Sequence, residues 1–92
     1  MHTGTLRVRL LVREARSLKD KRQVAQSIKA RLRNEYNVAV AEVDALEHRQ
    51  MIVLGVATIA AEAKLARSTL DDVLRALRGH PVAEFIDHEM EI

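Results

Sequence analysis

The order in which the apolar residues change their spacing restricts the fold of this 92-residue chain more than any other feature. Apolar residues occupy every second position from Leu6 to Val12, and they return at helical spacing between residues 18 and 34. A period of two indicates a half-buried strand, whereas a period near 3.6 indicates an amphipathic helix. The chain is therefore expected to begin with a strand and a helix. Ser17 and Asp20 together predict a capping box where that helix starts.

A hairpin is expected to follow the first helix. Residues 38–46 predict a second strand whose alternation slips near Ala41 and Glu42, which indicates a bulge. A polar turn at residues 47–50 leads into residues 51–60, which are apolar on both faces. Such a segment is typical of a strand in the middle of a sheet.

The last third of the chain repeats the order of helix and strand. Residues 62–78 have helical spacing, and Gly79 is expected to end that helix. Residues 82–92 predict a last strand whose alternation places Phe85 on the same face as Asp87.

The resulting order, βαββαβ, predicts an α+β fold in a single domain. Two βαβ halves joined by a hairpin are the pattern of a ferredoxin-like sandwich. In that sandwich both helices cover one face of a four-stranded antiparallel sheet, and the strand order is 4-1-3-2. The fold class is thus predicted before any functional argument.

The charge of the chain changes sharply at residue 33. From Arg7 to Arg33 there are ten Lys and Arg residues against two acids, whereas the remainder has five bases against eleven acids. The net charge of +2 therefore hides a strong asymmetry. Because clustered Lys and Arg attract phosphates, this asymmetry points to a polyanionic partner.

Some of these cations have a structural explanation. The first and last strands are neighbours in the predicted sheet, so basic residues of one lie opposite acidic residues of the other. The basic residues are Arg7, Arg9 and Arg13, and the acidic residues are Asp87, Glu89 and Glu91. We expect them to pair across the strands, each pair contributing about 0.2–1 kcal/mol.

The candidate binding site is the basic first helix. Cations crowd its first turns, where the helix dipole makes them unfavourable, and free backbone N–H groups there suit an anion. A basic stripe continues along one side of the helix. The alternative is that this stripe is only a solvated face. The predicted nucleic-acid or anion-binding residues are Arg16, Ser17, Lys19, Lys21, Arg22, Lys29 and Arg33.

Several segments resemble a known family. They are RSLKDKR at residues 16–22, ARLRNEYNV at 30–38, AEVD at 41–44 and LGV at 54–56, followed by the acidic last strand. Together they are similar to the small bacterial YlxP-like family, also filed as domain-of-unknown-function family 503. The resemblance covers essentially the whole chain and implies a ferredoxin-like fold and an association with RNA or the ribosome. It supplies no catalytic residue.

In the segment RSLKDKR the family usually has Glu where this chain has Asp20. The Asp side chain keeps the carboxylate that caps the helix, but it is shorter than that of Glu. The positions that carry over as the family's basic signature are Arg16, Lys19, Lys21 and Arg22. Their role in the family is a conjecture, so the resemblance identifies positions rather than a mechanism.

Other functions find little support in the sequence. The four histidines have no metal-ligand spacing, the chain has no cysteine, and no serine has the surroundings of a nucleophile. We therefore expect no enzyme activity, metal or cofactor. With only Tyr36 and Phe85 as aromatic residues, the chain cannot stack bases as an RNA-recognition motif does, so RNA would be bound through phosphates and shape. No membrane segment is apparent, and we expect a cytoplasmic protein.

A second class of function follows from residues 51–60. This strand is apolar on both faces, yet two helices can cover only one. The open face of the sheet is therefore expected to form a homodimer. The alternative to RNA binding is a homo-oligomeric assembly or regulatory module that binds a protein or a small ligand.

Overall fold

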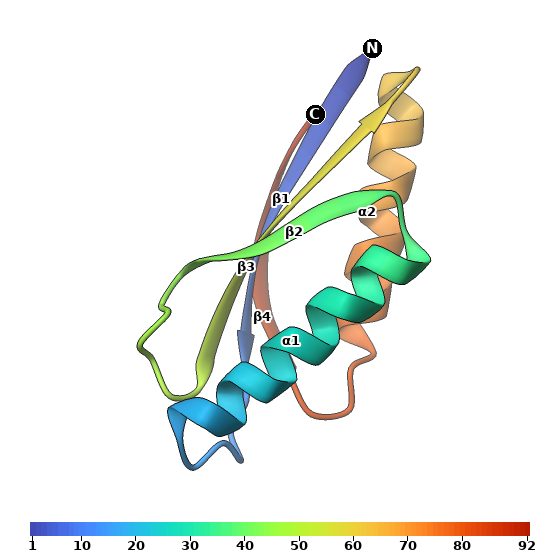
Figure 1. Ribbon diagram of the computed structural model, residues 1–92. Coiled ribbons are helices and arrows are strands. Elements are labelled where there is room, and N and C mark those ends of the chain that lie inside the picture. Colours follow the sequence, from blue (N-terminus) through green and yellow to red (C-terminus); the bar gives the residue numbers. More distant parts are fainter.

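The computed structural model describes all residues, 1–92, and has the predicted order of elements. The four strands form one antiparallel sheet in the order β2-β3-β1-β4, which is the predicted order counted from the other edge. Both helices lie on the same face of this sheet (Figure 1). The fold is thus a ferredoxin-like α+β sandwich. The elements are β1 (His2–Leu11), α1 (Leu18–Glu35), β2 (Val38–Asp44), β3 (Met51–Ala60), α2 (Ala63–Arg78) and β4 (Glu84–Glu91).

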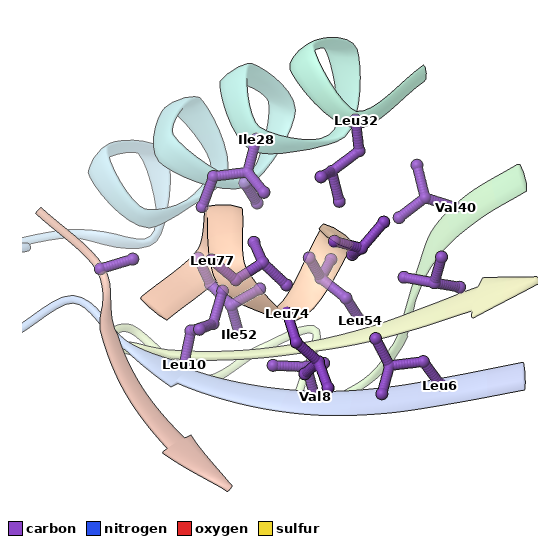
Figure 2. Close-up of a cluster of buried hydrophobic side chains, with 14 of the residues drawn as sticks. Leu6, Val8, Leu10, Ile28, Leu32, Val40, Ile52, Leu54, Leu74 and Leu77 are labelled. Atoms are coloured by element: carbon purple, nitrogen blue, oxygen red, sulfur yellow. The ribbon is translucent and has the colours of Figure 1, made fainter. Parts of the chain in front are cut away.

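The hydrophobic core fills the space between the helices and the sheet. Leu6, Val8 and Leu10 of β1 point toward Leu74 and Leu77 of α2 (Figure 2). Ile28 and Leu32 close the core from α1, and Ile52 and Leu54 contribute from β3. Each fully buried Leu or Ile contributes roughly 1.5–3 kcal/mol by leaving water. No helix of the structure has the length and apolar character needed to cross a membrane.

The first strand is longer than predicted. It begins at His2 rather than Leu6, because residues 2–5 pair with residues 57–60 at the end of β3. This segment contains His, Thr and Gly, which have little alternation of their own. Its extended form follows from a neighbouring apolar strand, a tertiary effect that overrides local propensity.

A bulge interrupts each edge strand. In β2 the register shifts between Glu42 and Asp44, close to the predicted position. The strand then ends, and the exposed Leu46 lies beyond it, so its assignment to the strand was wrong.

In β4 the register shifts so that Leu10 pairs with Phe85 while Arg9 pairs with Asp87. The extra residue, Ile86, moves Phe85 to the helix-covered face, where it packs against the core. Phe85 therefore does not share a face with Asp87, which corrects the prediction from alternation.

Candidate functional site

Lys21, predicted to bind an anion, is fully buried, with 0% of its surface exposed. Its Nζ lies 3.2 Å from Glu42 Oε2 and donates to the carbonyl oxygens of Ala45 (3.2 Å) and Leu46 (3.4 Å). A buried lysine needs such partners. Through these contacts Lys21 links α1 to the end of β2 and to the loop after it. This result removes Lys21 from the candidate binding site.

The start of α1 has the predicted capping box. Ser17 Oγ accepts a hydrogen bond from the backbone N–H of Asp20 at 3.1 Å. The Asp20 carboxylate in turn accepts from the backbone N–H of Arg16 at 3.0 Å, one residue before the cap. Ser17 is therefore occupied as a helix cap, and a carboxylate already lies beside the first turn. An anion would have to be held by the surrounding cations.

The basic stripe along α1 is only partly free. Arg33 donates to the backbone carbonyl of Val40 at 2.8 Å, so it provides a hydrogen-bond donor for a carbonyl of the edge strand β2. The guanidinium of Arg22 lies 3.9 Å from Glu47, and both side chains are exposed. Lys29 is half-buried and forms no ion pair. Arg33 is therefore exposed but engaged with β2, Arg22 is exposed beside Glu47, and Lys29 is half-buried.

The free cations gather where α1 begins. Arg16 and Lys19 are exposed and have no acidic partner. Arg16 also lines a hollow of about 530 Å³ together with Glu47, His48 and Arg49 of the loop between β2 and β3. Arg49 is not among the predicted site residues, because it lies in the acidic part of the chain. The exposed Arg16, Lys19, Arg22 and Arg49, together with the half-buried Lys29, are called the basic surface below.

The arginines of β1 and Arg13, two residues after the strand, pair with acids, as predicted, but only in part with the predicted acids. Arg9 forms a bidentate pair with Asp87, in which Nε lies 2.8 Å from Oδ1. Arg13 pairs at 2.6 Å with Glu84, which is not one of the three predicted acids. The hydrogen bonds from Arg9 hold the pKa of Asp87 below its ordinary value.

Arg7 pairs with an acid of β2 rather than with one of β4. It stands opposite Glu89 in register, yet its guanidinium pairs with Asp44 of β2 at 3.0 Å. Glu89 and Glu91 are left without any ion pair. These two acids of β4 face the open side of the sheet.

The open face also carries a hollow of about 520 Å³ above β3. Its floor is made of small residues, among them Ala41, Gly55 and Ala57. Val43 at the rim of the hollow is 53% exposed, whereas Val53 of the same face is only 3% exposed. The apolar character predicted for this face is present, with Arg7 and Arg9 screening one end of it.

Two histidines organise loops. His48 Nδ1 accepts the N–H groups of Gln50 and Met51, and His80 Nδ1 accepts those of Val82 and Ala83. His80 is therefore a loop residue, as predicted. No group of three or more His, Asp or Glu side chains is arranged to hold a metal ion.

The comparison with known families agrees with this architecture. The family model described as "Protein of unknown function (DUF503)" matches residues 3–90, which include nearly the whole sheet and both helices. No curated protein matches the chain. Because the match extends over almost every residue of the sandwich, the chain belongs to the family of proteins of unknown function DUF503.

Proposed function

We propose that this protein is a non-enzymatic cytoplasmic binding module that contacts the phosphates of structured RNA through the basic surface. The observation that carries the proposal is that Arg16, just before α1, and Arg49, in the loop after β2, line one hollow beside the first turn of α1, which carries the exposed Lys19. Arg16 and Arg49 face this hollow although they are 33 positions apart in the chain. Guanidinium groups suit phosphate because their donors match its oxygens in pairs.

The position of the basic surface adds a second argument. Cations in the first turn of a helix are unfavourable by about 0.3–1 kcal/mol because they face the positive end of the helix dipole. Lys19 lies in that turn, is exposed and forms no ion pair. Stability alone does not account for it, whereas a bound phosphate would offset the repulsion. The resemblance to YlxP-like proteins also supports an association with RNA or the ribosome.

The test is binding to a fluorescently labelled, structured ribosomal RNA fragment, followed by anisotropy between 50 and 200 mM salt. About four phosphate contacts correspond to a loss of affinity of roughly 50-fold to 150-fold over this range, the larger value applying to duplex regions. The variant is Arg16→Gln/Lys19→Gln/Arg49→Gln, which leaves Lys21 in place so that the fold is preserved. We expect this variant to bind at least tenfold more weakly and with a shallower salt dependence.

A matched control removes three exposed cations of α2 instead, as Lys64→Gln/Arg67→Gln/Arg75→Gln. It changes the net charge equally but leaves the basic surface intact. Equal weakening in both variants would show unspecific attraction rather than a site. Failure of the parent to bind at 50 mM salt would refute RNA binding.

A second candidate function is protein association through the open face of the sheet. The observation that favours it is the uncovered apolar surface above β3, where Val43 at the hollow and Ile59 farther along the same face are about half exposed (53% and 49%). An apolar patch that stays exposed marks an interaction surface more often than chance. The predicted homodimer is one form of this association, and static light scattering tests it. Unlike RNA binding, association through such a face weakens little as salt rises.

A further inference from the structure

The hollow of the open face lies beside two acids that have no partner. Glu89 and Glu91 of β4 line the hollow, and no Lys, Arg or His of the chain pairs with either. The cation directly opposite Glu89 in the register is Arg7, and Arg9, the next cation of β1, is paired with Asp87. The guanidinium of Arg7 is held by Asp44 instead, on the far side of β3. The sheet thus leaves free negative charge at one rim of an apolar depression.

The depression itself depends on small side chains. A Cβ at position 55 would lie 2.7 Å from Cγ1 of Val43, so glycine is what lets Val43 lie at the rim of the hollow without a clash. Ala41 and Ala57 are the neighbours of Gly55 in the sheet and on the strand, and both are exposed. Val43 itself covers Gly55, so the open part of the floor lies over Ala41 and Ala57, where it can accept a side chain of moderate size such as Val, Ile or Leu.

The charges of this face decide between two occupants. The face carries two cations, both already in ion pairs, against four acids. Two copies placed face to face would bring four unpaired carboxylates together with no free cation to meet them, which is unfavourable. A basic partner meets them directly. The charged residues concerned are Arg7, Arg9, Asp44, Asp87, Glu89 and Glu91.

We infer that the hollow docks a segment of another protein that presents an apolar side chain and a Lys or Arg on the same side. This inference rests on the second candidate function, protein association through the open face, and is independent of RNA binding. Strands of a sheet lie about 4.8 Å apart, so Gly55 on β3 and Glu89 on β4 are separated by roughly 10 Å. In an extended segment, side chains two residues apart are about 7 Å apart, and a Lys side chain covers the remaining distance. An apolar residue over β3 with a Lys two positions away therefore fits.

The probe for this site is the peptide acetyl-Ser-Val-Ser-Lys-Ser-Val-Ser-Lys-amide. Its Val and Lys side chains share one side when the chain is extended. Binding is followed through the backbone amide signals of the isotope-labelled protein by NMR. We expect saturable shifts at Ala41, Gly55, Ala57 and Glu89. A peptide with Glu in place of Lys, and one with Ser in place of Val, are each expected to bind at least threefold more weakly.

The protein variant is Glu89→Gln/Glu91→Gln, in which two exposed carboxylates without an ion pair are removed. We expect it to bind the Lys peptide about threefold to tenfold more weakly, as two solvent-exposed ion pairs would account for. The control is Glu14→Gln/Asp71→Asn, which removes two exposed, unpaired acids elsewhere and should leave the affinity unchanged.

Three results would overturn the inference. They are the absence of shifts on the open face at millimolar peptide, equal binding of the Lys and Glu peptides, and equal losses in the two variants. A concentration-dependent dimer in light scattering that Ala57→Lys converts to monomer would assign the face to a second copy. None of these results bears on the anisotropy experiment, so the two proposals fail separately.

Discussion

Replacing Lys21 by Met should destabilise the protein more than any other substitution of a charged residue. The Met side chain retains the aliphatic stem of Lys21, which is fully buried, but it removes the ammonium group. The carboxylate of Glu42, whose side chain is only 10% exposed, then loses its single cationic partner. Removing one partner of a buried ion pair typically costs about 3–5 kcal/mol, because the other charge stays buried and uncompensated.

The backbone contacts of Lys21 add less to this loss. The carbonyl of Ala45 also accepts the N–H of His48 at 3.0 Å, so it retains a donor. The carbonyl of Leu46 belongs to an exposed residue and can turn to water. We therefore expect the free energy of unfolding to fall by about 3–5 kcal/mol, a large share of the roughly 5–15 kcal/mol of a small domain.

The double variant Lys21→Met/Glu42→Met tests the electrostatic cause. It removes both charges and keeps the volume apolar, a change that is often neutral for buried ion pairs. We expect it to recover most of the loss and to lie within about 2 kcal/mol of the parent. The control Arg22→Met changes a neighbouring, exposed side chain and should alter the stability by less than about 0.5 kcal/mol.

Urea unfolding followed by circular dichroism measures all four proteins. The reasoning would be refuted by a Lys21→Met variant as stable as Arg22→Met, or by a double variant less stable than the single one. In the first case the ammonium group would contribute nothing. In the second, packing of the stems rather than charge would hold α1 against the loop.

Three further perturbations have definite outcomes. The pKa of His80 is lowered by partial burial and by the charge of Arg31. The stability conferred by neutral His80 is therefore complete above about pH 6.5 and declines as the pH falls below that value. The urea midpoints at pH 5 and pH 7.5 should differ more for the parent than for His80→Asn. The pKa of Asp87 is lowered by its hydrogen bonds from Arg9. The contribution of Asp87 to the free energy of unfolding is therefore complete above about pH 4 and is lost as the pH falls through the lowered pKa. The stability difference between the parent and Asp87→Asn should vanish on acidification. Leu54→Ala removes a fully buried side chain and should cost about 2–5 kcal/mol in the same unfolding assay, whereas a loss below about 1 kcal/mol would contradict its place in the core.

The apolar periodicity was sufficient to predict the fold because most inward-facing positions of the strands and of both helices obey it. The bounds of β3 were predicted without error, at Met51–Ala60. The bulge in β4 was not predictable, because an inserted residue reverses the alternation without leaving a mark in the composition. Phe85 shows the consequence, since one residue decides whether it faces solvent or the core.

The burial of Lys21 could have been predicted from its position in the helical repeat of α1. It precedes Ala25, Ile28 and Leu32 at the same helical spacing, so it belongs to the buried stripe of α1. Glu42 follows Val40 by two positions and therefore faces the core from β2. Two opposite charges at inward positions imply a buried pair. Counting charges along the sequence concealed this relationship, because it treats every cation as exposed.

The remaining free charge is separated along the molecule, which has extents of 42 × 22 × 21 Å. Arg16 and Lys19 lie where α1 begins, at the end opposite to the chain termini, whereas Glu91 lies one residue before the C-terminus (Figure 1). This separation greatly exceeds the Debye length of about 8 Å at physiological salt, so the two surfaces do not neutralise each other. Each therefore keeps its own field and attracts a partner of opposite sign. A polyanion at the basic surface and a basic segment at Glu89 and Glu91 would consequently occupy the protein without competing, which a single mixed surface could not permit.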